Sequence, residues 1–341
     1  MRILLAIFAC WLGLTSMASA QQKVTLRVAD SLPIGHIIIE TSTKPWINLV
    51  RKLSKGRIDI QYFPAEQMGK AKDFLRLTQS GVIDVGYVVP SYISEKMPLS
   101  AVAELPGSFN NSCQVMHAYW DLAKEGGYLY EHEFRVNKIR PLFIAALPPY
   151  QVVLGNSGRF QKLADLAGKK LRASGGAQEL TLRKLNMVPV RMAPPEIYDA
   201  MSRGTIDGTL LSYVSIGAYK LMDITKTATI GQNFGTVVIT YSISDAKWRQ
   251  LPKDLQDILK QAGDKITQDA CTTFDRNETL AAEQMRKHGI SLVRFDKADQ
   301  NTLNAATAEV AADWAKSLDS RGKPGTATLE AFRKALLKFS N

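Results

Sequence analysis

The chain of 341 residues is 45% hydrophobic and carries 43 Lys and Arg against 32 Asp and Glu, which gives a formal net charge of +11. This length exceeds one comfortable hydrophobic core and predicts two domains. A basic surface favours anionic partners, but the positive charges are spread and no Lys/Arg cluster is interleaved with aromatic residues, so nucleic acid is not expected as a partner.

The N-terminus has the pattern of a secretory signal peptide over residues 1–20. Arg2 provides the positive charge, residues 3–14 are nearly all apolar, and residues 18–20 offer an Ala-Ser-Ala cleavage site. The apolar run is too short for a comfortable membrane span, and no later segment approaches the roughly 18 uncharged apolar residues of a membrane helix. We therefore expect an exported protein that resides in the periplasm of a double-membrane bacterium. An uncleaved anchor and, from Cys10, a lipoprotein signal are less favoured.

Cys113 and Cys271 are the only cysteines after residue 20. They could pair in an oxidising compartment, but two cysteines so far apart make no disulfide framework, and the predicted fold does not require the bond. The sequence leaves their state open.

Strand and helix patterns alternate along the first part of the mature chain. Strands are expected at residues 24–29, 57–63 and 82–89, and helices at 41–53 and 71–79. This β-α-β-α-β order predicts a parallel or mixed sheet with helices on its faces.

A second series of patterns begins near Lys138. In it, strands are expected at 139–146, 150–154, 171–172 and 205–211, and helices at 163–168, 178–185 and 195–202. Residues 80–86 resemble residues 203–209, because in each a glycine that ends a helix runs straight into a strand. Two similar α/β units in tandem predict a two-lobed protein with a cleft between the lobes.

The last part of the chain is expected to be helical, over residues 255–289, 297–318 and 329–339. Helices this long could brace both lobes. No low-complexity segment or long linker separates the two halves, so we expect the chain to cross between the lobes more than once.

No catalytic constellation appears in the sequence. It contains no G-x-S-x-G, H-E-x-x-H, Walker A or C-x-x-C motif, and no paired carboxylates with a defined spacing. Glu131-His132-Glu133 could suggest a metal site, but adjacent residues of a helix do not share a face, so we expect a solvated run of charges. The sequence therefore predicts a binding protein rather than an enzyme, with no metal and no cofactor.

Arg172 is the main candidate for ligand binding. It lies where a short strand passes into the small residues Ser174-Gly175-Gly176, a position that opens onto the ligand crevice in α/β proteins. A guanidinium fits a carboxylate with two parallel hydrogen bonds, so Arg172 predicts capture of organic acids unless it is a surface charge. His36, in the first strand-to-helix loop, either contacts the ligand or caps the helix that follows.

Five segments occur in an order and spacing that are typical of one family. They are residues 29–36 (ADSLPIGH), 62–69 (YFPAEQMG), 81–85 (GVIDV), 165–172 (DLAGKKLR) and 204–208 (GTIDG). Each is a weak motif alone, but together they resemble the solute-binding proteins of TRAP (tripartite ATP-independent periplasmic) transporters, of the dicarboxylate-binding type. The resemblance covers essentially the whole mature chain.

The resemblance implies an α/β, two-lobed periplasmic binding protein fold with hinge strands and a long helix spanning both lobes. We expect residues 21–148 and 237–280 in lobe I and residues 149–236 and 281–341 in lobe II. The family closes around an organic acid, which an arginine at the position of Arg172 binds through its carboxylate. It then delivers the acid to a membrane permease of a small and a large subunit. We expect the protein to be a monomer.

Two departures from relatives that bind sialate narrow the predicted ligand. Many of those relatives have a second arginine in the hinge strand, where this chain has Gln151, and a Glu-Asn-Pro element where Thr209 follows Asp207-Gly208. A polyhydroxylated sugar acid would leave its hydroxyls without partners, which is costly in a buried site. The prediction is a monocarboxylate with an apolar or aromatic body, with a C4-dicarboxylate or keto acid as the alternative.

The predicted ligand-binding residues come from the strand ends and loops that should face the cleft, and Tyr87 is a further candidate for the pocket wall. They are Leu32, His36, Pro90, Ser91, Tyr92, Tyr150, Gln151, Arg172, Ser174, Ser212, Tyr213 and Asn233. The tyrosines could instead be ordinary half-buried residues at strand ends. Other classes remain open: an ABC-type binding protein, a sensor subunit that presents its ligand to a receptor, and, least favoured, a secreted enzyme.

Overall fold

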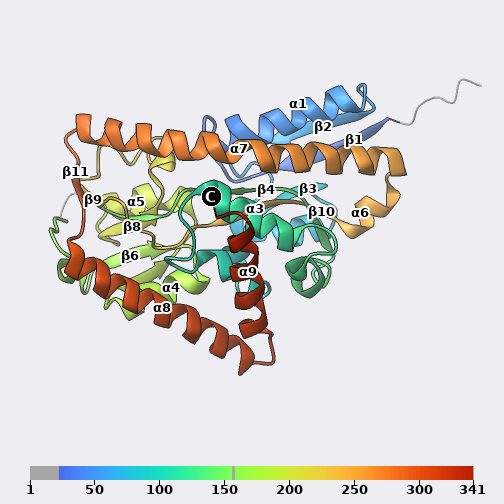
Figure 1. Ribbon diagram of the computed structural model, residues 1–341. Helices are drawn as coiled ribbons and strands as arrows, with labels where there is room; N and C mark the ends of the chain where they lie inside the picture. Colours follow the sequence, from blue (N-terminus) through green and yellow to red (C-terminus); the bar gives the residue numbers. More distant parts are fainter. Residues whose placement is uncertain (1–22, 156–157, 341) are drawn as a thin grey trace, which may run out of the picture.

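The computed structural model describes residues 23–155 and 158–340, so the predicted signal peptide lies outside the described residues. Two sheets form the centre of the molecule (Figure 1). The first contains, in spatial order, β2 (Ile58–Phe63), β1 (Val24–Ala29), β3 (Val85–Val88), β10 (Val238–Ser244) and β4 (Ile139–Ala146).

In this first sheet β1 pairs in parallel with β2 and β3, whereas β10 runs antiparallel to β3 and β4. Parallel neighbours need crossover connections, and these contain α1 (Lys44–Leu53) and α2 (Phe74–Gln79). A π-helical turn at Ile39–Thr43 precedes α1. The expected strand at 82–89 is shorter in the structure, because the carboxylate of Asp84 accepts hydrogen bonds from the backbone and side-chain nitrogens of Arg27 at 2.8 and 3.0 Å.

The second sheet has the spatial order β11 (Ser291–Val293), β9 (Thr227–Thr229), β5 (Gln151–Leu154), β8 (Gly208–Leu211), β6 (Lys170–Ala173) and β7 (Val188–Arg191). Strands β8, β6 and β7 are parallel, and β5 is antiparallel to β8 and β9. The crossovers contain α4 (Gly176–Lys184) and α5 (Ile197–Ser202). The chain enters this sheet after β4 and leaves it before β10, so it crosses between the sheets more than once, as predicted.

Helix α7 (Lys253–Lys287) joins the two halves. Its 35 residues correspond to about 50 Å at 1.5 Å per residue. It packs on α1 and β4 of the first half and on β11 and the 3-10 turn Tyr213–Ser215 of the second, and Figure 1 shows it running along both sheets. This confirms the predicted α/β fold with a long helix spanning two lobes. The lobe boundaries given above remain a prediction.

Close packing and a disulfide fix α7 against the first sheet. A Cβ at Gly263 would lie 1.7 Å from the carbonyl oxygen of Leu142, so only glycine allows this approach to β4. A disulfide joins Cys271 to Cys113 of α3 (Ser112–Ala123), with the two Cα atoms 4.8 Å apart. The structure therefore decides the question that the sequence left open.

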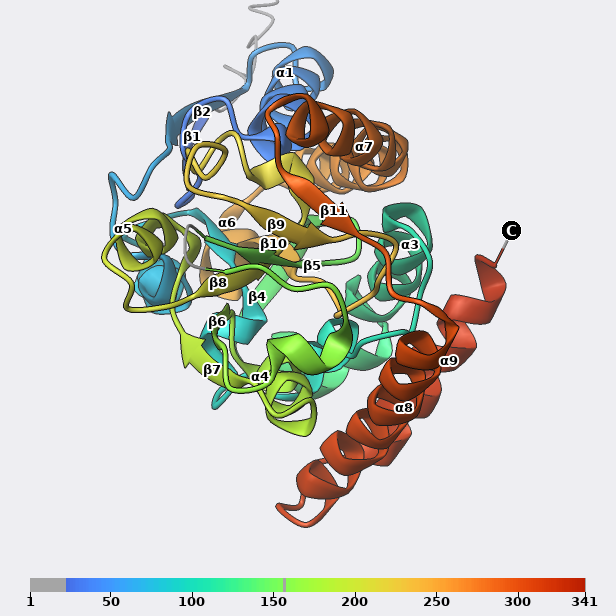
Figure 2. The same ribbon diagram turned by 90° about the vertical axis from the view of Figure 1, so that its left-hand side faces the viewer.

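The C-terminal helices cover one side of the molecule. The short helix α6 (Asp245–Gln250) precedes α7, and α8 (Lys297–Asp319) lies against α4 before α9 (Gly325–Lys338) turns back against α3. In Figure 2, α8 and α9 lie on the side away from α1. No helix in the described part of the chain is long and apolar enough to cross a membrane.

The interpretation of Glu131-His132-Glu133 as a solvated run was wrong for Glu133. This side chain is buried, and its carboxylate accepts hydrogen bonds from the backbone N–H groups of Leu99 and Ser100. Burial raises its pKa to about 7. Within residues 23–155 and 158–340, no group of three or more His, Cys, Asp and Glu side chains is arranged to hold a metal.

Candidate functional site

Arg172 is completely buried in β6, with 0% of its surface exposed. Its Nε donates to the carbonyl of Met192 at 2.9 Å and its Nη1 to that of Leu210 at a long 3.4 Å. Its Nη2 has no hydrogen-bond partner, and no carboxylate in the described part of the chain forms a salt bridge with it. A buried cation without a counterion is costly, so this guanidinium is arranged to receive an anion.

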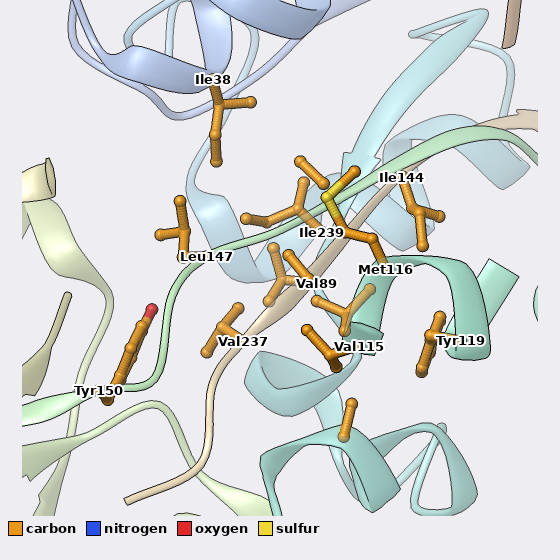
Figure 3. Packing of buried hydrophobic residues seen from close by; sticks show 14 of the residues in the cluster. Ile38, Val89, Val115, Met116, Tyr119, Ile144, Leu147, Tyr150, Val237 and Ile239 are labelled. Atoms are coloured by element: carbon orange, nitrogen blue, oxygen red, sulfur yellow. The ribbon is translucent and has the colours of Figure 1, made fainter. Parts of the chain in front are cut away.

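A small, nearly filled cavity, with free space of only about 10 Å³, lies next to Arg172, between the two halves of the molecule. Its walls are mostly apolar and aromatic: Leu32, His36, Ile38, Tyr87, Tyr92, Leu147, Tyr150, Pro194, Leu211, Ser215, Tyr219, Val237 and Ile239. Several of these follow the carboxyl ends of β1, β3 and β8, where open α/β sheets bind ligands. Figure 3 shows Leu147 with Tyr150 on one crossing segment, Val237 with Ile239 on its neighbour, and Ile38 approaching from the first half.

Arg172 lies close to three tyrosines of the cavity wall. Burial raises the pKa of Tyr92, Tyr150 and Tyr219, and the positive charge of Arg172 opposes that rise in all three. Their hydroxyls therefore lie in the field of the positive charge and stay protonated at neutral pH. They can donate or accept hydrogen bonds without adding charge.

His36 lies elsewhere in the cavity and is neutral. Its Nδ1 accepts a hydrogen bond from the backbone nitrogen of Ile38 at 3.2 Å, which leaves the proton on Nε2. Its ring meets that of Tyr219 edge-on, with the centroids 5.5 Å apart. Burial lowers the pKa of His36 to about 3, so the ring offers a hydrogen-bond donor and no positive charge.

The structure brings five predicted residues to the cavity wall: Leu32, His36, Tyr87, Tyr92 and Tyr150. Pro90 and Ser91 form the 3-10 turn that carries Tyr92. Ser174 donates its hydroxyl to Gln178 at 2.7 Å and lines a cleft on the other side of Tyr92, together with Met192. The Oγ of Ser212 is buried without a partner.

Gln151, Tyr213 and Asn233 line a different cleft, which lies between the crossing segments and α7. Gln151 donates to the carbonyl of Gln232 at 2.6 Å, and Asn233 donates to that of Phe109 at 2.5 Å. The hydroxyl of Tyr213 donates to a carbonyl of β9. These polar groups hold the crossing segments together, and a direct role in ligand binding stays a prediction for all three.

Sequence reasoning missed several residues of the cavity, among them Leu147, Pro194, Leu211, Ser215, Tyr219, Val237 and Ile239. The apolar residues at the ends of β4 and β10 look like any strand termini. Ser215 and Tyr219 belong to the irregular segment after β8, which carries no periodic signal. They reach the cavity wall only because this segment folds back against β1 and β3.

Contacts from an exposed arginine and a buried glutamate join the two halves beside the cavity. Arg191 of β7 donates to the carbonyl of Ser91 at 3.0 Å and to the hydroxyl of Ser94. Glu104, buried at the end of the 3-10 helix Leu99–Glu104, lies at the first turn of α4. Burial raises its pKa to about 8, although the N–H groups at the start of α4 oppose the rise.

Two α/β units, joined by crossing strands and closed over a cavity beside an unpaired arginine, define a two-lobed ligand-binding protein. The model of one family, described as "Bacterial extracellular solute-binding protein, family 7", matches residues 29–317. The chain belongs to this family. The family consists of solute-binding proteins, which agrees with the expectation of a binding protein rather than an enzyme.

Known proteins that resemble the chain over nearly its whole length fit this assignment. The C4-dicarboxylate-binding periplasmic protein DctP of Rhodobacter capsulatus is 23% identical, with 92% of this chain and 91% of that protein covered. A TRAP solute-binding protein of Rhodoferax ferrireducens, solved with copurified benzoate, is 23% identical with a TM-score of 0.83, covering 93% and 98%. A marine metagenome TRAP protein in complex with metahydroxyphenylacetate is 22% identical with a TM-score of 0.86, covering 94% and 100%.

Proposed function

We propose that this protein captures a carboxylic acid with a single anionic group and an apolar or aromatic body, and that Arg172 binds the carboxylate. The observation that carries the proposal is the completely buried guanidinium whose Nη2 lacks a partner. A carboxylate can take up Nη2 together with the weakly bonded Nη1 and neutralise the buried charge.

The residues of the cavity wall favour a ligand with one anionic group rather than two. No Lys or Arg is among the described residues that line the cavity, and most of these are Leu, Ile, Val, Pro and Tyr. Micromolar capture requires roughly 8 kcal/mol, whereas one charged hydrogen-bonded contact supplies on the order of 1.5–3 kcal/mol. Apolar burial, at roughly 25 cal/mol per Å², has to supply most of the remainder.

The ligands of two similar structures support this class of compound. The Rhodoferax ferrireducens protein holds copurified benzoate, and the marine metagenome protein holds metahydroxyphenylacetate. Both ligands are aromatic monocarboxylates, which have the single charge and the apolar body that the lining residues and Arg172 of this chain favour.

The proposal also includes the location of the protein and its membrane partner. The signal pattern of residues 1–20 and the extracellular family support export to the periplasm with cleavage of the signal peptide. The protein then delivers its ligand, as a monomer, to a TRAP permease of a small and a large membrane subunit.

Isothermal titration calorimetry with a panel of acids tests the proposal. We expect benzoate or a related monoacid to bind, whereas succinate and sialate do not. Arg172→Gln should weaken binding about 100-fold or more, because it removes one partner of a buried charge pair, and Arg172→Lys should lose much of the affinity because it lacks the planar fork. Arg183→Gln, an exposed change on α4, is the control. Binding of dicarboxylates alone, or unchanged affinity in both Arg172 variants, contradicts the proposal.

A further inference from the structure

A residue of the cavity wall also has an unpartnered polar atom, in the turn that follows β8, the strand paired with β6. Ser215 lies at the end of the 3-10 turn after β8, is fully buried and lines the cavity. Its Oγ has no hydrogen-bond partner. An unpaired buried hydroxyl costs free energy that a bound polar group would recover, so this atom marks a second point of ligand contact.

Tyr219 connects Ser215 with His36. The backbone nitrogen of Tyr219 donates to the carbonyl of Ser215 at 3.2 Å, so the two residues lie one turn apart. The ring of Tyr219 also packs edge-on against His36, whose Nε2 carries the proton because Nδ1 accepts from Ile38. Ser215, with its unpartnered hydroxyl, and His36, with its imidazole donor, therefore both line the cavity and both contact Tyr219.

Apart from Arg172, whose positive charge also acts on Tyr219, the groups around this region are uncharged or negative. The imidazole of His36 is neutral, and the cavity lining contains no Lys or Arg among residues 23–155 and 158–340. The buried carboxylate of Asp30 lies close enough that its negative charge contributes to the raised pKa of Tyr87 and Tyr219. A second carboxylate on the ligand would be desolvated next to Asp30 without a cation to pair with, whereas a neutral oxygen would find a donor and a hydroxyl.

We infer that the ligand carries, besides the carboxylate bound by Arg172, one neutral oxygen substituent, a hydroxyl or carbonyl group, which Ser215 Oγ and His36 Nε2 bind. This inference rests on the proposed function and deepens it. It names the substrate class as hydroxylated or keto monoacids, and it makes Ser215 and His36 the residues that determine specificity.

Calorimetry with matched pairs of acids that differ by one oxygen tests the inference. The pairs are benzoate against 2-, 3- and 4-hydroxybenzoate, and phenylacetate against mandelate and 3-hydroxyphenylacetate, with isophthalate as the dianion. In the wild-type protein at least one hydroxy acid should bind about 5- to 10-fold more tightly than its parent, as expected for one buried hydrogen bond. Isophthalate should bind more weakly than benzoate.

Ser215→Ala should reduce that preference to within about 2-fold while leaving the affinity for the parent acid unchanged, because it removes only the hydroxyl. Ser317→Ala, an exposed change on α8, is the control and should keep the preference. His36→Phe keeps an aromatic ring without the N–H donor and should also reduce the preference for hydroxy acids. If the His36→Phe variant fails to fold, the result for Ser215→Ala alone decides the test.

The outcomes separate the two proposals. If benzoate or phenylacetate binds through Arg172 but no hydroxy acid gains affinity, or if Ser215→Ala retains the full preference, this inference is overturned and the proposed function stands. If no monoacid binds at all, the proposed function fails and this inference fails with it.

Discussion

Gly175 of the second lobe lies directly against Ser91 of the first. A Cβ on Gly175 would lie 2.5 Å from the carbonyl oxygen of Ser91, and the φ angle of Gly175 is +128°. The small residues that follow Arg172 therefore let the two backbones meet beside the cavity. Their role in the structure is to allow contact between the lobes.

Gly175→Ala is expected to impair closure of the lobes. The new methyl group would overlap a backbone atom, and such overpacking typically costs about 1–3 kcal/mol in addition to the strain of a positive φ. We expect a lower melting temperature and at least a 5-fold loss of ligand affinity, measured by differential scanning fluorimetry and calorimetry.

Gly168→Ala provides the matched control. Gly168 also has a positive φ, +74°, but nothing lies within 4 Å of a Cβ built there. Its variant should lose stability through backbone strain alone and keep its ligand affinity relative to wild type. Equal losses of affinity in both variants would contradict a specific role for the Gly175–Ser91 contact.

Glu104 is expected to make the folded protein less stable as the pH rises. Burial raises its pKa to about 8 from the ordinary value of 4.5, so between these values the folded protein holds a proton that the unfolded chain has released. The free energy of unfolding therefore falls between pH 4.5 and 8, by at most about 1.4 kcal/mol per pH unit for one group. Glu104→Gln should flatten this decline in urea unfolding measured from pH 5 to 8.

Other titratable groups also contribute to the dependence of the free energy of unfolding on pH. Asp30, Glu133 and Glu278 also have raised pKa values, about 6, 7 and 7, so part of the decline persists in the variant. His36 acts in the opposite direction below pH 6.5, because its pKa is lowered to about 3. Glu330→Gln, at an exposed position of α9, should leave the slope unchanged, and an identical slope in Glu104→Gln would refute the assignment.

Strands β1, β2 and β4 could be predicted because each combines an apolar run with a clear turn signal, whereas the seven-residue strand β10 was missed. Strands β1 and β4 coincide with their predicted ranges. Strands β7, β9 and β11 have only three or four residues, and their pairing depends on neighbours that are distant in the chain. Helix α3 was missed because its burial comes from α7 and α9, which lie more than a hundred residues further along the sequence.

Which residues of the candidate site could be predicted depends on the same distinction between local sequence signals and contacts that are distant in the chain. Leu32, Tyr92 and Tyr150 could be predicted because they follow or precede strands whose ends meet at one cleft. Ser215 could not be predicted, because it reaches the cavity only where the irregular segment after β8 folds back against the first lobe. The burial of Glu133 was also hidden, because the sequence gives no sign that the N–H groups of Leu99 and Ser100 need an acceptor.

The disulfide between Cys113 and Cys271 should contribute substantially to stability. It closes a loop with a sequence separation of 158 residues and ties α3 to α7. Disulfides typically stabilise by about 2–4 kcal/mol, so a Cys113→Ala/Cys271→Ala double variant should unfold at a clearly lower urea concentration. Adding a reductant should destabilise the wild-type protein and leave the double variant unaffected. Equal midpoints for the two proteins without reductant would show that the bond contributes nothing.

Gln151 is expected to act on the crossing segments rather than on the ligand. Its side-chain nitrogen donates to Gln232, and its side-chain oxygen accepts from the hydroxyl of Thr229 at 2.9 Å and from the backbone nitrogen of Gln232 at 3.2 Å. Gln151→Ala leaves these buried groups without partners, which should lower the free energy of unfolding by about 1–3 kcal/mol. The relative affinities for different acids should stay the same, because the cavity wall is unchanged. Calorimetry with the acid panel at a temperature where the variant is folded checks this, and an altered order of preference would instead make Gln151 a ligand contact.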